Sequence, residues 1–175
     1  MSSELLPALR RAGRTILVLS TLALLAGCQV RPLYSSAGTV PGKLAAVKIS
    51  AADDRVEQNV RNRLVFLLNG GSGEPAQADY QLQMNVSAVR ANILDDEIST
   101  ALTPGRVTVT VTYALIATRD SKVLKSATRS VTSLVDIGYQ EFSKLRAYRD
   151  AEDRASRELA EVIRADLAAI LGRQD

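Results

Sequence analysis

The sequence predicts an α+β fold, a two-layer sandwich in which a mostly antiparallel four-stranded sheet carries two amphipathic helices packed on one face. Two stretches, Tyr80–Ala88 and Val107–Ile116, alternate apolar and polar residues as half-buried antiparallel strands do. Two others, 50–69 and 148–171, repeat apolar residues at helical spacing. Because the sheet and each helix have a single apolar side, we expect these sides to pack together.

The first strand and the first helix are expected next to each other. A short apolar stretch, Leu44–Ile49, is the expected strand. The helix expected over Ser50–Asn69 opens with capping-box spacing between Ser50 and Asp53, and Gly70 ends it. Its apolar stripe consists of Val56, Val60, Leu64, Leu67 and Leu68.

Three longer strands are expected over 80–93, 107–119 and 123–135, with a tight reversal at Asp120 and Ser121 before the last of them. The pattern of 123–135 is too weak to say which of its faces points inward. A long amphipathic helix is then expected over 148–171, ended by Gly172. Its apolar side consists of Ala151, Ala155, Leu159, Val162, Ile163, Leu167 and Ile170.

The composition excludes several classes of site. The 175-residue chain has no histidine and one cysteine, which removes the usual general base, the usual zinc ligand and any internal disulfide. We therefore expect no enzyme activity, no metal and no cofactor. The paired acids at Asp53 and Asp54, and at 95–97, lack the spacing of a calcium loop. No run of lysine and arginine could follow a phosphate backbone, so nucleic acid is not expected as a partner.

Residues 1–27 are expected to be a cleavable lipoprotein signal peptide. Three arginines precede an apolar run, 15–26, that is shorter than the ~20 residues needed to span a bilayer. The run ends in Leu-Ala-Gly-Cys at Cys28, which resembles the bacterial lipobox, in which the thiol is acylated and the cysteine becomes the N-terminus. An ordinary signal peptide, or an uncleaved anchor with an incidental cysteine, is the alternative.

The mature chain is expected to divide into a lipidated tether, 28–43, and a single periplasmic α+β domain, 44–175. The tether segment is rich in Pro, Gly and Ser. Gln29 follows the cysteine, and by resemblance to bacterial lipoproteins the absence of Asp there implies the outer membrane. The formal charge of +3 falls to about +1 once the leader, with three arginines and one glutamate, is removed.

Two surfaces are candidates for binding. The predicted outer face of the sheet is uncharged, which fits either a docking surface or a solvated Thr-rich sheet. Loops 94–106 and 136–147 should meet at one end, where cations could hold phosphates or carboxylates, or could be ordinary solvated charges. The outer face consists of Gln81, Gln83, Asn85, Ser87, Thr108, Thr110 and Thr112. The cations are Arg106, Lys144 and Arg146, with Arg90 as a further candidate. The same loops carry the acids Asp95, Asp96, Glu97 and Glu141.

The stretch from Gly27 to Tyr34, Gly-Cys-Gln-Val-Arg-Pro-Leu-Tyr, resembles the start of mature lipopolysaccharide-assembly lipoproteins of the LptE family. Val60–Leu64, Val-Arg-Asn-Arg-Leu, is similar to another stretch of that family. The order of elements also fits over essentially the whole mature chain. This chain departs from the family at Gln29 and Val30, where Gly-Phe or Gly-Trp is common.

The resemblance implies an outer-membrane lipoprotein that plugs the lumen of the β-barrel LptD and assists the insertion of lipopolysaccharide into the outer leaflet. It also implies contact with the anionic head region of that lipid, for which Arg106, Lys144 and Arg146 are the candidates. A periplasmic lipid- or ligand-binding lipoprotein without a barrel partner is the alternative, and it would need an apolar cavity between sheet and helices. A hydrolase would need a carboxylate pair in a cleft.

Overall fold

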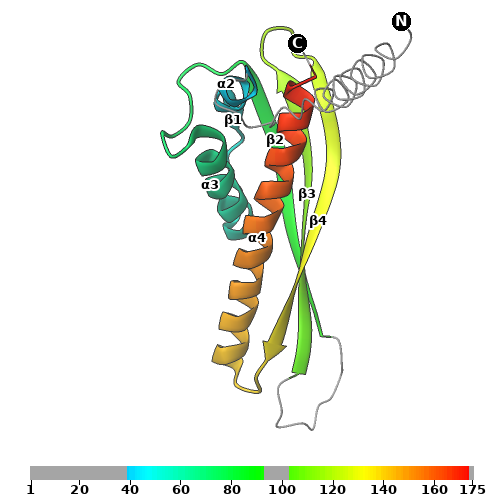
Figure 1. Cartoon of the computed structure of the whole chain (residues 1–175). Coiled ribbons are helices and arrows are strands. Elements are labelled where there is room, and N and C mark those ends of the chain that lie inside the picture. The colour runs from blue at the N-terminus through cyan, green and yellow to red at the C-terminus, as the bar shows by residue number, and fades with distance from the viewer. Residues whose placement is uncertain (1–38, 93–102, 174–175) are drawn as a thin grey trace, which may run out of the picture. The chain divides into compact units, whose positions relative to one another are not determined.

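A computed structural model describes residues 39–92 and 103–173 of the chain (Figure 1). These residues all belong to the second of the two compact units into which the chain divides, Leu33–Asp175. The predictions made for the signal peptide, for Cys28 and for the acids at 95–97 lie outside the described residues.

The four strands form one sheet in the order β1-β2-β3-β4. The short β1 (Val47–Ile49) runs parallel to β2, and the other neighbours are antiparallel. The long strands are β2 (Tyr80–Asn92), β3 (Thr103–Ala117) and β4 (Val123–Ile137). Three described helices, α2, α3 and α4, lie on one side of this sheet, and no described helix lies on its other side (Figure 1). The predicted α+β class with helices on one face is confirmed.

Helix α2 (Thr39–Ala45) was not expected, because its residues were assigned to the tether and to the first strand. Val40 and Leu44, one helical turn apart, are both buried in the core, and Lys43 Nζ donates a hydrogen bond to the backbone oxygen of Leu171 at 3.2 Å. The expected strand at Leu44–Ile49 is therefore wrong over its first half. Apolar residues four apart suit a helix that packs on the end of α4, and only Val47–Ile49 is extended.

Helix α3 (Arg55–Asn69) begins later than predicted, because the capping residue is Asp54 and not Ser50. The Asp54 carboxylate accepts from the Glu57 backbone N–H at 2.8 Å, and the Glu57 carboxylate accepts from the Asp53 N–H at 3.0 Å. The Ser50 hydroxyl instead accepts from the Met84 N–H, so it belongs to the sheet. Gly70, at φ 59°, ends the helix in the left-handed conformation.

Helix α4 (Glu141–Leu171) is 31 residues long and covers β3 and β4. It starts before the predicted Tyr148, so most of the segment expected to be loop 136–147 is strand or helix. Strand β4 lies at the edge of the sheet, and Val131 and Ile137 show which of its faces points to the core. The core between sheet and helices includes Leu64, Leu82, Val107, Val109, Tyr113, Leu115, Leu159, Ile163 and Leu167, each at most 1% exposed.

Candidate binding surfaces

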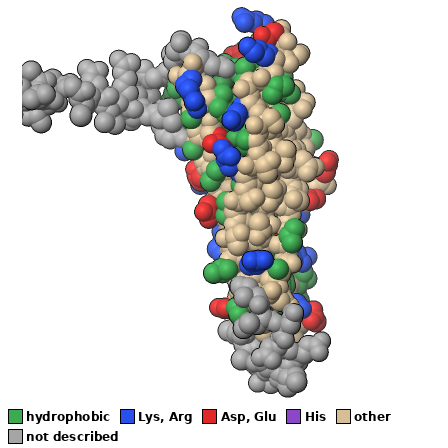
Figure 2. All heavy atoms as spheres, turned by 90° about the vertical axis from the view of Figure 1, so that its right-hand side faces the viewer, with side chains coloured by type: hydrophobic (Ala, Val, Ile, Leu, Met, Phe, Trp, Pro, Cys, Tyr) green, Lys and Arg blue, Asp and Glu red, His purple; other side chains and the backbone are tan. Residues whose placement is uncertain are grey.

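The middle of the side of the sheet away from the helices is an uncharged polar surface, as the alternation predicted. We call the following residues the bare sheet face: Gln81, Gln83, Asn85, Ser87, Thr108, Thr110, Thr112, Ser126, Thr128, Ser130 and Thr132. All of them are exposed except Thr108 and Thr110, which are half-buried by their neighbours. In Figure 2 the middle of this side is drawn almost entirely in the colour of backbone and uncharged polar side chains.

Strand register builds the bare sheet face from hydroxyl pairs across β3 and β4. Thr108 bonds to Thr132 at 2.9 Å, Thr110 to Ser130 at 2.9 Å, and Thr112 to Thr128 at 3.1 Å. Pairs of this kind across neighbouring strands hold the side chains in one conformation. The surface is therefore ordered before any partner binds to it, while each hydroxyl keeps acceptor capacity for a partner.

The structure places the three candidate lipopolysaccharide-binding cations at one end of the sheet but on two faces. We call this end, where β3 and α4 begin, the tip. Arg106 is exposed between the buried Gly105 and Val107, so it points to the bare side of the sheet. Lys144 and Arg146 lie on the first two turns of α4, on the covered side. The register pair between Thr103 and Ile137 keeps the two chain segments adjacent.

Exposed apolar side chains at the tip were missed by the sequence analysis. Leu134, Tyr139 and Phe142 are 68%, 74% and 72% exposed. The Arg146 guanidinium carbon lies 5.8 Å from the centre of the Phe142 ring, and Lys144 pairs with Glu141 at 3.9 Å. The available signal was the placement of two aromatic residues in a segment predicted to be a loop, in a chain with only 4% aromatic residues. The tip thus combines cations with an apolar surface.

A buried carboxylate, Glu152, was also missed. Its side chain is 3% exposed and joins three elements, since it accepts from Arg55 on α3 and from Arg90 on β2. Arg90 Nη2 lies 2.6 Å from a carboxylate oxygen, and its guanidinium carbon lies 5.2 Å from the centre of the Tyr148 ring. The sequence signal was an acid one turn beyond Tyr148, next to the apolar stripe of the helix. Because both Glu152 carboxylate oxygens are paired with arginines of other elements, we interpret this cluster as a structural contact between α3, α4 and β2.

Tyr113 forms a second polar contact beneath the sheet. Its hydroxyl donates to an Asp166 carboxylate oxygen at 2.7 Å, and Arg129 Nε donates to the same oxygen at 2.8 Å. Burial is the main reason that the pKa of the Tyr113 hydroxyl is raised, and the hydrogen bond to Asp166 adds to it. The folded chain therefore holds this proton to a higher pH than the unfolded chain does.

We expect this raised pKa to weaken the fold in alkaline solution. Above about pH 10, an unfolded tyrosine ionises while folded Tyr113 stays protonated, so the free energy of unfolding falls by up to about 1.4 kcal/mol per pH unit. Below that pH the contribution is complete. Urea unfolding at about pH 8 and pH 11 should show a smaller alkaline loss for Tyr113→Phe than for the wild type. Tyr139→Phe, at an exposed position, is the control, and an equal loss in all three proteins would contradict the prediction.

Neither a cluster of metal-ligating side chains nor a membrane-spanning helix is found among the described residues. Within 39–92 and 103–173, no three His, Cys, Asp or Glu side chains come close enough to share a metal ion. None of the helices in these ranges is both long enough and apolar enough to cross a bilayer. Surface pockets lie at the tip, lined in part by Gly105 and Arg154, and at the opposite end of the sheet, lined in part by Asp79 and Arg119.

Comparison with known proteins gives a shared fold. No protein-family model matches the sequence, and no curated protein is significantly similar to it. Among solved structures, a lipoprotein of Caulobacter crescentus has a TM-score of 0.64 at 21% identity, over 79% of this chain and 98% of that one.

Two further bacterial lipoproteins are similar at greater distance. Rare lipoprotein B of Shewanella oneidensis has a TM-score of 0.52 at 15% identity, over 70% of this chain and 92% of that one. A minor lipoprotein of Acinetobacter baumannii has a TM-score of 0.50 at 16% identity, over 70% and 88% of the two chains. The chain therefore shares its fold with these bacterial lipoproteins.

Proposed function

We propose that the mature chain is an outer-membrane lipoprotein of the LptE type, anchored through Cys28 at the periplasmic face. It acts as the plug and assembly partner of an LptD-type β-barrel that inserts lipopolysaccharide into the outer leaflet. The lipobox-like leader and the fold shared with bacterial lipoproteins support the anchor. The bare sheet face is the observation that carries the proposed partner.

The chemistry of the bare sheet face suits the wall of a polar lumen. Burying a charged group against a partner requires its desolvation, which costs several kcal/mol unless the group is well paired. Hydroxyl and amide side chains are desolvated at much lower cost and can donate or accept as the partner requires. A surface that must slide into a barrel and then stay there gains from carrying no charge over its centre.

The tip supports contact with lipopolysaccharide. Arg106, Lys144 and Arg146 offer cations for phosphate or carboxylate groups, and exposed Phe142 offers apolar surface beside Arg146. A lipid with an anionic head and acyl chains presents both kinds of group. On this proposal, one end of the plug would contact the lipid while the bare sheet face holds the barrel.

The alternative, a carrier that holds a lipid or other ligand without a barrel, is less well supported. Such a carrier needs an apolar cavity between sheet and helices. In the described residues this layer is filled by side chains such as Leu82, Leu159 and Ile163, which are fully buried. Two described pockets lie at the ends of the sheet and include charged residues in their lining. A third, between α3, β2 and α4, is lined mainly by charged residues such as Arg55, Arg90 and Glu152, so it is not an apolar cavity.

A charge in the centre of the bare sheet face should break the complex. Thr110 pairs with Ser130 in the middle row, so Thr110→Lys places an ammonium where the barrel wall would lie. An unpaired buried charge costs several kcal/mol, and we expect at least about a tenfold loss of barrel that co-purifies in detergent with a C-terminally tagged chain. The barrel is identified by mass spectrometry and its stoichiometry with the wild type should be one to one.

The matched control is Ala165→Lys, which adds the same charge at an exposed position on α4 and should leave the co-purified amount unchanged. Circular dichroism and urea unfolding of both variants should show that the fold is retained. Recovery of the wild-type chain without any barrel, or an equal yield of barrel with Thr110→Lys, would contradict the proposed function.

A further inference from the structure

The tether joins the described domain at the end opposite the tip. Thr39, the first described residue, begins α2, and Lys43 of α2 donates a hydrogen bond to the backbone oxygen of Leu171 at the end of α4. Figure 1 shows α2 near that end of α4. A helix of 31 residues is about 45 Å long, so Phe142 lies about that far from the tether end. The chain from Cys28 to Thr39 can span at most about 40 Å. The tether end is thus limited to a distance of about 40 Å from the anchor.

Exposed cations gather at this tether end. We call four of them the tether-end cations: Lys48 on β1, Arg119 and Lys122 in the turn between β3 and β4, and Lys125 on β4. Within the described ranges, none of these four side chains has a carboxylate partner. Several other cations of the described residues are ion-paired, among them Arg55, Arg61, Arg63, Arg90, Arg129 and Arg154. The tether-end cations therefore keep their charge available to a partner outside the chain.

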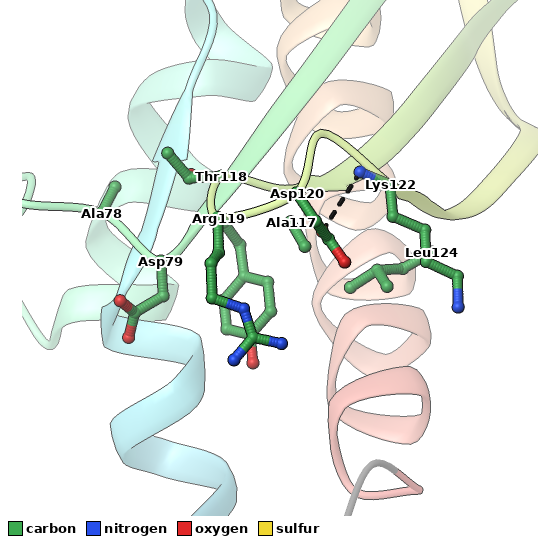
Figure 3. A pocket seen from close by; sticks show the side chains of 9 residues that line it. Ala78, Asp79, Ala117, Thr118, Arg119, Asp120, Lys122 and Leu124 are labelled. Atoms are coloured by element: carbon green, nitrogen blue, oxygen red, sulfur yellow. Dashed lines mark hydrogen bonds between the residues drawn. The ribbon is translucent and has the colours of Figure 1, made fainter.

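A pocket of about 630 Å³ shows how the turn presents these groups (Figure 3). Arg119 and Lys122 line it together with Leu124, Asp79 and Asp120. The Asp120 carboxylate accepts a hydrogen bond from the Lys122 backbone N–H at 3.3 Å, so one of its oxygens is engaged with the backbone of the turn. Val123, next in sequence, is 55% exposed. Cations beside apolar side chains are the surface expected at a boundary between water and lipid.

We propose that the tether-end cations bind anionic phospholipid headgroups of the leaflet that holds the Cys28 anchor. The inference rests on the proposed anchor and adds a membrane-contact surface to it. Phosphate groups supply the opposite charge, and the tether keeps them at high local concentration, so weak individual contacts suffice. This contact orients the domain, because it holds the tether end at the membrane and leaves the tip about 45 Å away.

The test uses the complete lipidated chain in vesicles. Because the native cysteine carries the lipid, Thr118→Cys in the turn, or Ser143→Cys near the tip, provides a unique thiol for a fluorophore. Spin-labelled headgroup lipids quench fluorophores that touch the membrane surface. We expect quenching at 118 in phosphatidylcholine vesicles with about 30% phosphatidylglycerol, and at least about threefold less in pure phosphatidylcholine or at ~0.5 M salt. Position 143 should stay unquenched.

A matched pair of charge variants separates the patch from net charge. Arg119→Gln with Lys122→Gln should reduce quenching at 118 by at least about half, because attraction to the surface is additive over cations. Arg149→Gln with Arg157→Gln removes the same charge from exposed positions of α4 and should have no effect. The first pair should also retain the co-purifying barrel, which shows that the two surfaces are separate.

Four results would overturn the inference. Two concern the wild-type charges: equal quenching at 118 in neutral and anionic vesicles, or quenching at 143 equal to that at 118. The other two concern the variants: reduced quenching with both pairs of charge substitutions, or unchanged quenching with both. Quenching that appears only when lipopolysaccharide is added to neutral vesicles would reassign the surface to that lipid. A wild-type chain that shows the quenching but co-purifies no barrel would overturn the plug alone. If mass spectrometry of the wild-type chain showed no acyl chains on Cys28, both the proposed anchor and this inference would be overturned.

Discussion

Leu64→Ala is expected to lower the free energy of unfolding by about 3 kcal/mol. Leu64 is fully buried on α3, and the alanine would leave a cavity in the layer between sheet and helices. The loss combines the transfer of the missing carbons with the contacts that the cavity walls no longer make. Urea unfolding followed by circular dichroism measures it.

The control lies on the same helix. Phe66 is 55% exposed and has the Arg63 guanidinium carbon 5.7 Å from its ring centre, so Phe66→Ala removes a larger side chain from a wetter site. We expect it to cost less than about 1 kcal/mol. If the two variants were destabilised equally, the core would not lie where the buried residues place it.

Glu152→Gln is expected to lower the free energy of unfolding by about 2 kcal/mol, the second largest effect. The amide keeps the volume of the side chain but removes the negative charge that Arg55 and Arg90 share. Breaking a fully buried ion pair typically costs about 3 to 5 kcal/mol. The expected loss is smaller because the side chains of Arg55 and Arg90 are 45% and 41% exposed. Water can therefore solvate the two guanidinium groups when they lose the carboxylate.

Asp150→Asn serves as the comparison, since Asp150 pairs with Arg154 one turn away on α4 and is 64% exposed. An exposed pair of this kind contributes about 0.5 kcal/mol or less. A double-mutant cycle with Arg90→Met would measure the coupling to Glu152 directly. Zero coupling in the cycle, or equal losses from Glu152→Gln and Asp150→Asn, would show that Glu152 is not the joint between α4 and β2.

The local pattern predicted most of the elements but misplaced several ends. Alternation over 80–88 and 107–116 identified two strands and the side to which each residue points, and helical spacing identified α3 and α4. Element ends depend on weaker signals. Asp54, and not Ser50, caps α3 because Ser50 bonds to β2, a contact between segments 34 residues apart. The first turns of α4 were missed because Phe142 and Leu145 are exposed and do not extend the apolar stripe.

The candidate surfaces were predictable to different degrees. The bare sheet face follows from a period of two along single strands, and the structure adds Ser126, Thr128, Ser130 and Thr132 from β4 to it. The tip depends on contacts between strands and a helix. Arg106 shares an end with Lys144 and Arg146 but faces the other side of the sheet, which loop positions alone did not indicate.

By itself the sequence determined the α+β class, the one-sided amphipathicity of each element and the uncharged outer side of β2 and β3, because these properties depend on residues within a few positions of each other. Only the tertiary structure decided that α2 packs on the end of α4, that Glu152 lies buried between two arginines, and that β4 turns Val131 toward the core. The physical reason is that burial of a group depends on what covers it. For these groups the covering residues come from distant parts of the chain.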